Sequence, residues 1–393
     1  MKKELIFKNK SSIKSEVIIK WLIFGFIVLS FFETYLVSSI GAYARYYIII
    51  LIGAILLLSD KFIFKWYHAC YFLWFILKLA SFFWTPNDYI AKLHLFSHIG
   101  MTMLLITSTI VNYKESIVGF IHKSLWLNSG FMGLLMLFFR RSSFDSGETR
   151  QVLYLFGQEM DPNNQAAFLA VGIIISLFFL FNKKHIFFSL IIMIINLYMI
   201  LLTGSRGGLV SIAIAALLMF LSMKSTKGDL YKKVFLMSIV TLITFFVVKV
   251  FLPEDIYKRL FDFSTYAGGS NRVLIWRNSL DLLLSGNILT GSGWGAYYGY
   301  QGLEATTHNT FISMLIDVGL IGFLLFFVPL VYSSYYLFKR KNFLPIYLII
   351  NVLIVSFFIE TINKRFFWIP IILMFLEYNR EKQKQIVLNE ELV

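Results

Sequence analysis

Long apolar stretches recur along almost the whole chain and are separated by short polar tethers. Stretches of roughly 18 or more apolar residues are long enough to cross a bilayer as helices, whereas the alternation of a membrane β-strand is absent. A helix also satisfies its own backbone hydrogen bonds, as lipid requires. The pattern therefore predicts an all-α, polytopic integral membrane protein with about twelve transmembrane helices. The apolar stretches lie near residues 17–32, 45–58, 63–84, 90–111, 117–139, 164–181, 186–202, 207–223, 234–252, 308–337, 343–360 and 364–379.

Two polar interruptions are much longer than the other tethers, at residues 141–163 and 253–307. A chain that only crossed a membrane would not need them, so we expect function there. Within the second, the apolar residues of Asn271 to Leu284 return at helical spacing, which predicts an amphipathic helix lying on the membrane surface. The predicted apolar face contains Val273, Trp276, Leu280, Leu283 and Leu284.

The interruptions divide the chain into six parts. These are N-terminal transmembrane helices (1–140), a first loop (141–163), transmembrane helices with a glycine-rich hairpin (164–252), a large loop (253–307), C-terminal transmembrane helices (308–379) and a charged tail (380–393).

Lysine residues gather in every second tether of this pattern. Since cytoplasmic loops of membrane proteins carry an excess of Lys and Arg, these tethers are predicted to face the cytoplasm, and both termini with them. The two long loops and the turn at residues 203–208 then fall on the extracytoplasmic side. The residues that set this orientation are Lys61, Lys65, Lys114, Lys183, Lys184, Lys224, Lys227, Lys232, Lys233, Lys339, Arg340, Lys341, Arg380, Lys382 and Lys384.

Composition agrees with a membrane protein, because 58% of the residues are hydrophobic and only 15% are charged. The net charge of +14 also occurs in nucleic-acid-binding proteins. Lysines that face anionic lipid explain it more simply, so no nucleic-acid partner is expected. The single cysteine, Cys70, excludes an intramolecular disulfide and a cysteine-based metal site.

Arginine is distributed differently from lysine. Of the eleven arginines, nine fall on the predicted extracytoplasmic side, against the usual bias of cations. A guanidinium is a planar fork that can hold phosphate through two hydrogen bonds, so we expect an anionic ligand on that side. Chance differences in composition between loops are the alternative. The nine are Arg45, Arg140, Arg141, Arg150, Arg206, Arg259, Arg272, Arg277 and Arg365.

Two short motifs lie near apolar segments on this side. In the run from Thr203 to Gly208, glycines let the backbone approach a ligand and Arg206 provides a grip for phosphate, although a tight helical hairpin with an interfacial arginine explains it equally well. Asp161 before Pro162 is typical of a helix N-cap, and orienting a sugar hydroxyl is the alternative.

The large loop supplies the remaining candidates. Arg272 and Arg277 flank Trp276, and Tyr297 is one of several aromatic residues that suit either sugar stacking or an interfacial belt. His308 opens the next apolar segment. A helix N-terminus disfavours the imidazolium form, so His308 is expected to be neutral and able to accept a proton, with a capping or interface role as the alternative.

Four motifs in this order resemble the O-antigen ligase and polymerase superfamily. They are Thr203-Gly-Ser-Arg-Gly-Gly208, Ser270-Asn-Arg272 with Trp276, Gly291-Ser-Gly-Trp-Gly295, and His308-Asn-Thr310 followed by Gly319-Leu-Ile-Gly322. Each motif is weak alone, but the order and spacing over about residues 160–325 are specific. The first half of the chain is similar to the family only in hydropathy. Asn271 departs from the pattern, because many members have a small residue there.

The resemblance implies a GT-C-like, metal-independent, inverting glycosyltransferase that needs no cofactor. It would work at the extracytoplasmic face of a bacterial cytoplasmic (inner) membrane on oligosaccharides linked to undecaprenyl diphosphate. Arg206 and Arg272 would hold the donor diphosphate, and His308 would activate the acceptor hydroxyl. Further substrate contacts are expected from Arg277, Asp161, Asn163, Ser205, Asn309 and Tyr297.

The favoured function is polymerisation of lipid-linked repeat units of a capsule, exopolysaccharide or O-antigen. The partners expected besides membrane lipid are a chain-length regulator and a flippase. A ligase that moves the finished glycan to a terminal acceptor is the first alternative. A flippase or other transporter is the second, disfavoured because transporters show internal repeats and mid-membrane charges, and Asp317 is one of few deep carboxylates here.

Overall fold

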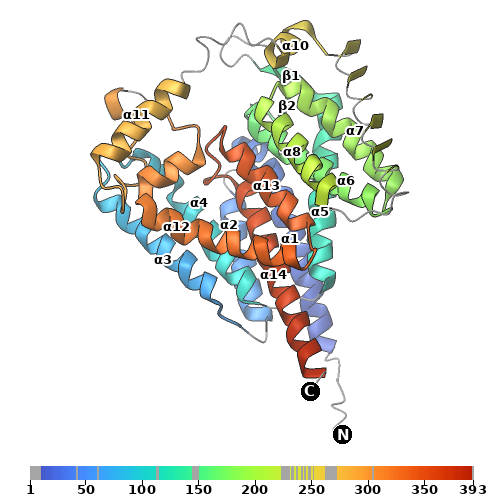
Figure 1. Cartoon of the computed structure of the whole chain (residues 1–393), viewed down its shortest axis with the longest axis horizontal. Coiled ribbons are helices and arrows are strands. Elements are labelled where there is room, and N and C mark those ends of the chain that lie inside the picture. Colours follow the sequence, from blue (N-terminus) through green and yellow to red (C-terminus); the bar gives the residue numbers. More distant parts are fainter. Residues whose placement is uncertain are drawn as a thin grey trace.

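The protein is an assembly of helices with one small sheet, as seen in a computed structural model (Figure 1). The structure describes residues 10–40, 43–59, 62–111, 115–143, 150–222, 252–261, 272–302 and 305–391, together with single positions between 231 and 250. The predicted segment 234–252 therefore lies largely outside the described residues, as do Ser270 and Asn271 of the motif.

The first half of the chain forms eight α-helices and a short 3₁₀ turn among the described residues. They are α1 (Lys10–Ile40), α2 (Tyr43–Leu58), α3 (Trp66–Ala80), η1 (Ser81–Phe83), α4 (Tyr89–Ile110), α5 (Glu115–Phe139), α6 (Pro162–Phe181), α7 (Ile186–Thr203) and α8 (Arg206–Ser222). The second half contributes α10 (Glu254–Phe261), α11 (Arg272–Ser285), η4 (Tyr300–Gly302), α12 (Thr310–Lys339), α13 (Leu344–Ser356) and α14 (Arg365–Glu391).

Several of these helices are long and apolar enough to cross a membrane, which confirms the all-α membrane class. Five meet both criteria within the described residues, at Ser15–Leu36, Tyr89–Ile110, Pro162–Phe181, Ile186–Thr203 and Thr310–Lys339. Three shorter apolar helices accompany them, at Arg45–Leu58, Arg206–Ser222 and Leu344–Ser356. A total of about twelve crossings and a GT-C-like fold stay predictions.

The first predicted loop contains a small antiparallel sheet that the sequence analysis missed. Its strands are β1 (Arg140–Ser143), β2 (Arg150–Leu155) and β3 (Gln158–Glu159), in the order β1-β2-β3. Phe156 and Gly157 connect β2 to β3 with φ values of 51° and 78°. Two positive φ values in a two-residue connection are typical of a tight hairpin turn. The aromatic and branched residues before this glycine were the available signal.

Close packing at the centre of the bundle depends on small and polar residues. Helix α6 lies against α5, α7, α8 and α13, and it is the most buried of the five long apolar helices. The Ser129 hydroxyl donates to the Phe168 carbonyl (2.9 Å), and the Asn196 amide donates to Ser129 Oγ (2.9 Å). Gly172 lies directly against both side chains. Membrane helices commonly associate in this way, because lipid provides little hydrophobic drive between them.

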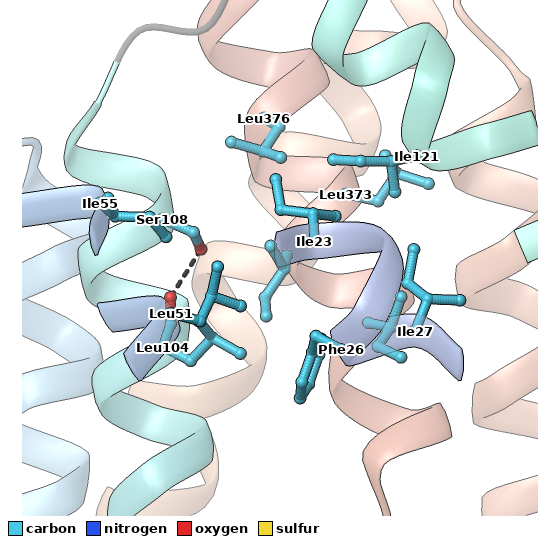
Figure 2. A pocket seen from close by; sticks show the side chains of 12 residues that line it. Ile23, Phe26, Ile27, Leu51, Ile55, Leu104, Ser108, Ile121, Leu373 and Leu376 are labelled. Atoms are coloured by element: carbon cyan, nitrogen blue, oxygen red, sulfur yellow. Dashed lines mark hydrogen bonds between the residues drawn. The ribbon is translucent and has the colours of Figure 1, made fainter. Parts of the chain in front are cut away.

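A small apolar cavity of about 40 Å³ lies between α1, α2, α4, α5 and α14 (Figure 2). Its polar lining residue, Ser108, donates its hydroxyl to the Leu104 carbonyl within the same helix (2.6 Å). With this group satisfied and aliphatic side chains around it, the cavity is a packing gap and not a candidate site for a sugar.

The elements that arise from the two long loops share one end of the molecule. The sheet, α10 and α11 lie at this end, and the C-terminal end of α14 lies at the opposite end (Figure 1). We call the former the loop end. The first turns of α4, α6, α8, α12 and α14 start from it, so helix N-termini and loop residues meet there.

Candidate functional site

The glycine-rich turn between α7 and α8 is held by arginines from two other elements. Gly204 ends α7 in the left-handed conformation (φ 61°), which glycine adopts without strain. The last carbonyls of a helix have no intrahelical partner. Here the Arg150 guanidinium donates to the Thr203 carbonyl (2.7 Å), and Arg259 donates to the Gly204 carbonyl (3.2 Å). Two of the nine arginines therefore have a structural task.

Arg206 opens α8 and completes a reciprocal arrangement with α10. Its Nε donates to the Arg259 carbonyl (3.0 Å), and its Nη2 donates to the same oxygen. Each of the two arginines thus binds the main chain beside the other. This fixes α10 against the glycine-rich turn and brings two guanidinium groups together at the loop end.

The N-terminus of α6 lies beside this turn. Asp161 caps the helix, since Oδ1 accepts hydrogen bonds from the Asn163 and Asn164 amides at 2.9 and 3.0 Å. Its predicted capping role is confirmed. Asn163 Oδ1 accepts from Arg150 Nη2 and from Ser205 Oγ, both at 3.0 Å. The structure therefore brings Asp161, Asn163 and Ser205 together with Arg206.

His308 lies immediately before α12, in the left-handed conformation (φ 48°). The helix begins at Thr310, and Asn309 caps it by accepting from the Phe311 and Ile312 amides. Trp276 of α11 donates its indole N–H to the Thr307 carbonyl (3.1 Å). This bond ties the segment before His308 to α11, on which Arg272 lies one turn before Trp276.

Charged residues of α11 and of the start of α6 both affect the pKa of His308. Burial lowers its pKa below 6.5, the charge of Arg272 lowers it further, and Asp161 acts in the opposite direction. The sequence analysis predicted the neutral imidazole but attributed it to the helix N-terminus, whereas burial is the main cause. Charges on α11 and at the start of α6 both reach this ring.

Residues 357–361, which follow α13, bridge the glycine-rich turn and the start of α12. Phe358 packs against Gly207, where an added Cβ would meet its ring at 2.9 Å. The Thr310 hydroxyl donates to the Ile359 carbonyl (3.1 Å). This segment therefore contacts the residue that follows Arg206 and the first residue of the helix that His308 precedes.

Glu360 is part of this segment and was missed by sequence reasoning. Its carboxyl lines a small pocket with Thr306, Thr307, Asp317 and Tyr297. Burial and the nearby Asp317 charge raise its pKa to about 7. In the sequence it is a lone glutamate at the end of an apolar segment, and no motif marks it.

The glycine-rich run of the large loop begins with the motif Gly291-Ser-Gly-Trp-Gly295. This run and the residues just before it are attached to α12 through main-chain hydrogen bonds. The Ser292 amide donates to the Ile316 carbonyl (2.7 Å), and the Leu320 amide donates to the Ile288 carbonyl (2.9 Å). At Gly319 the helix is broken by a positive φ of 63°, and an added Cβ there would lie 2.3 Å from the Leu289 carbonyl oxygen. Glycine alone allows the loop to approach the helix this closely.

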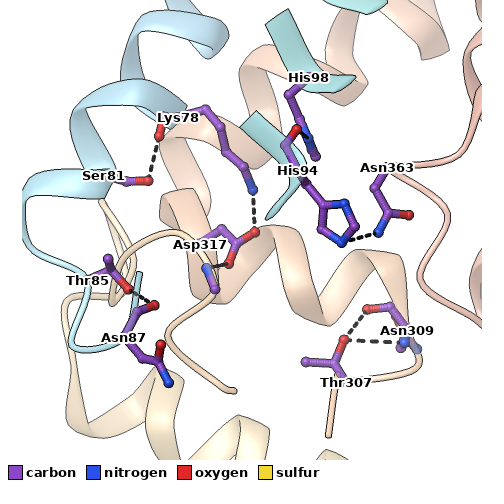
Figure 3. A network of polar contacts seen from close by, with 11 residues as sticks. Lys78, Ser81, Thr85, Asn87, His94, His98, Thr307, Asn309, Asp317 and Asn363 are labelled. Atoms are coloured by element: carbon purple, nitrogen blue, oxygen red, sulfur yellow. Dashed lines mark hydrogen bonds and ion pairs between the residues drawn. The ribbon is translucent and has the colours of Figure 1, made fainter. Parts of the chain in front are cut away.

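A buried ion pair supports the same junction. Lys78 of α3 pairs with Asp317 of α12, and Asp317 Oδ1 also accepts from the Gly295 amide (2.8 Å) (Figure 3). Lys78 and Asp317 are 1% and 5% exposed. The charged pair thus connects α3, α12 and the glycine-rich run at one point.

Three residues that were predicted to contact substrate do not lie with Asp161, Asn163 and Ser205 beside the glycine-rich turn. Arg277 is exposed on α11, away from that helix's buried side. Tyr297 is 3% exposed and packs with Ile275 and Leu283 in a small apolar cluster. Asn309 is buried as the α12 cap. Their contacts with substrate stay predictions.

The predicted apolar face of α11 is divided between surface and interior. Val273 is 82% exposed and Leu284 67%, with Leu280 also exposed, whereas Leu283 is buried. The buried side consists of Ile275, Asn278, Ser279 and Leu283. An exposed apolar strip on a helix suits contact with a membrane surface, and that orientation stays a prediction.

The loop end thus contains Arg206 at the glycine-rich turn and Arg272 on α11, together with a histidine whose pKa is lowered. Guanidinium groups stabilise negative charge on a phosphate oxygen, and a neutral imidazole accepts a proton near neutral pH. The arrangement therefore suits displacement of a phosphorylated leaving group by a hydroxyl.

Comparison with known families agrees with this chemistry. Residues 188–327 match the family model described as O-Antigen ligase, and no curated protein matches the chain. The match covers about a third of the chain and supports the resemblance to the O-antigen ligase and polymerase superfamily, whose members are glycosyltransferase-like enzymes. The matched range runs from α7 into α12 and includes Arg206, Arg272 and His308. Asp161 and Asn163 precede it, although the resemblance was placed at about residues 160–325.

Proposed function

We propose that this protein polymerises lipid-linked repeat units of a bacterial polysaccharide, on the extracytoplasmic side of the cytoplasmic membrane. The growing glycan would move from undecaprenyl diphosphate to the sugar end of a new lipid-linked unit. The observation that carries the proposal is that the charges of Arg272 and Asp161 both act on His308, whose helix is joined through Phe358 and Ile359 to the turn that contains Arg206. The family match supports the same class of transfer.

In the proposed reaction, His308 accepts the proton of the acceptor hydroxyl. The hydroxyl oxygen bonds to the anomeric carbon of the donor sugar while the bond from that carbon to the phosphate oxygen breaks. Undecaprenyl diphosphate leaves with the electron pair, and Arg206 and Arg272 stabilise its new negative charge. One displacement from the opposite side inverts the anomeric configuration.

The test is a comparison of glycan ladders from cells that produce single variants. We expect His308→Ala, Arg206→Ala and Arg272→Ala each to abolish long glycan while single repeat units remain. Arg206→Lys should fail as well, because an ammonium group cannot hold the Arg259 carbonyl through two bonds and also present a further N–H group to the ligand. Arg141→Ala is the matched control, since Arg141 stacks on Tyr154 of the sheet at the same end of the molecule.

Immunoblots would confirm equal amounts of each variant in the membrane. Normal chain lengths in all three site variants would reject the mechanism. The ligase function has independent support in the description of the matched family. It would be established instead if a variant accumulated lipid-linked polymer that was never attached to a final acceptor.

A further inference from the structure

A polar cavity of about 530 Å³ opens at the loop end between α1, α2, α4, α6, the sheet and the start of α14. Cavities of 300 to 1,000 Å³ typically hold a small-molecule ligand, but most of them are lined by apolar side chains. Most of the residues that line this one have hydroxyl, amide or charged side chains, although their apolar atoms also face the cavity. The lining residues that matter below are Glu33, Arg45, His94, Asn363, Lys364 and Arg365.

The charges around this cavity do not balance. Glu33 is paired with Arg365, whose Nη2 donates to Oε1 at 2.6 Å. Arg45 and Lys364 form no ion pair with any residue that the structure describes. Two positive charges are therefore left over, and a concave wall of one sign attracts a ligand of the opposite sign.

Uncharged polar groups in the same wall add a second requirement. Asn363 donates from Nδ2 to His94 Nε2 (3.0 Å), and its Oδ1 is buried without a hydrogen-bond partner (Figure 3). That oxygen has no surface in the cavity, whereas the amide side chains of Gln158 and Asn164 line it and provide acceptors that call for a donor. A diphosphate has none at neutral pH, whereas a sugar carries several hydroxyl groups. Phe168 and Phe366, whose ring centroids lie 5.2 Å apart, provide an apolar border.

The cavity adjoins the proposed transfer site. Met160 and Asn164 line it and flank Asp161, whose charge reaches His308. Lys364 lines it as well, and its charge acts on Glu360. A group bound in the cavity therefore lies next to residues that neighbour Asp161 and Glu360 of the proposed transfer site.

We propose that this cavity binds an acidic sugar of the acceptor glycan, with Arg45 and Lys364 facing its negative charge and amide oxygens of the wall accepting from its hydroxyl groups. The assignment to the acceptor rests on the proposed function, whereas the binding of an acidic sugar does not. If the cavity binds this sugar, the repeat unit that the protein polymerises contains a sugar that carries a carboxylate or a phosphate.

The test uses the full chain in detergent and saturation-transfer NMR with methyl glucuronide, methyl glucoside and inorganic pyrophosphate as probes. We expect methyl glucuronide to bind about fivefold more tightly than methyl glucoside. A difference of this size is typical of the binding free energy that a partly exposed charge pair contributes. The preference should disappear in the double variant Arg45→Gln/Lys364→Gln and persist in Lys364→Arg. Thermal unfolding would verify that each variant is folded.

Arg206→Ala separates this proposal from the proposed function. If this variant makes no polymer but still binds glucuronide, the result supports binding of the sugar in the cavity. If it loses both polymer and glucuronide binding, the sugar binds at the transfer site instead. Equal binding of the two glycosides, or a preference that survives the double variant, would overturn the proposal. Displacement of glucuronide by pyrophosphate in both wild type and Arg206→Ala would make the cavity a phosphate site.

Discussion

The environment of His308 is set by burial and by charged residues from two other parts of the chain. Burial keeps the ring neutral near physiological pH, and the charges of Arg272 and Asp161 act on it in opposite directions. Neutral histidine is the form that can accept a proton. The acid limb of the pH profile should therefore lie below pH 6.5, the ordinary pKa of the group.

Asp161→Asn tests this balance. Asparagine can still cap α6, but it removes the negative charge that raises the pKa of His308. We expect the acid limb of polymer formation in isolated membranes to move toward lower pH, by roughly half a unit. Asp255→Asn, on the exposed side of α10, should leave it unchanged. A shift toward higher pH would show that Asp161 does not act on His308 in this way.

For single residues, the sequence indicates which residue types could act in the site but not which residues lie next to them in the fold. Arg206 and His308 stand in motifs with a fixed order, so both could be selected without a structure. Glu360 could not, because its raised pKa depends on Asp317, which lies 43 positions earlier, and on burial by the fold. Likewise, Arg150 and Arg259 look like ligand-binding arginines until their bonds to the Thr203 and Gly204 carbonyls are seen.

Among the elements, α12 and the glycine-rich run depend on each other. Gly319→Ala should destabilise the protein by more than about 2 kcal/mol, because the residue has a positive φ and its new Cβ would collide with the Leu289 carbonyl. Thermal unfolding of purified protein would measure the loss. Gly302→Ala is the control, since Gly302 also has a positive φ (77°) but open space around it. Equal losses in the two variants would exclude the contact as the cause.

The sequence predicts helices well where apolar residues recur at helical spacing. It does not predict short strands, because these form only when they pair with another strand. The boundaries of α11 were predicted within a residue or two from spacing alone, but its buried side is set by the cluster around Tyr297 and Ile316. The sheet was missed because four-residue and two-residue strands carry little pattern of their own. Their pairing appears only when the chain folds back.

For the whole molecule, the ion pair of Lys78 and Asp317 joins helices that are 239 positions apart in the sequence. Lys78→Met should cost about 3 to 5 kcal/mol, because it leaves a carboxylate buried without its partner. The double variant Lys78→Met/Asp317→Asn should recover most of that loss, since asparagine still accepts from the Gly295 amide. Chemical or thermal unfolding in detergent would decide. A double variant as unstable as the single one would contradict this account.

Lysine positions predicted the orientation of the chain, but nothing in them indicates that α3 meets α12 or that α1 borders the polar cavity. Long-range contacts of this kind follow from how apolar faces of helices fit together, and a single sequence does not fix the partners. For the same reason, no motif indicated that residues 1–140 supply Glu33, Arg45 and His94 to that cavity.

The attachment of the glycine-rich run to α12 has a consequence for how such proteins diversify. Its bonds run between main-chain atoms, from the Ser292 amide to the Ile316 carbonyl and from the Leu320 and Ile321 amides to the Ile288 and Leu289 carbonyls. Main-chain atoms are the same in every residue. The side chains of Ile288 and Leu289, which are about half exposed, can therefore change without altering the path of the loop. Mutation can therefore vary this surface while the glycines hold the path of the loop, and the fold itself does not have to change.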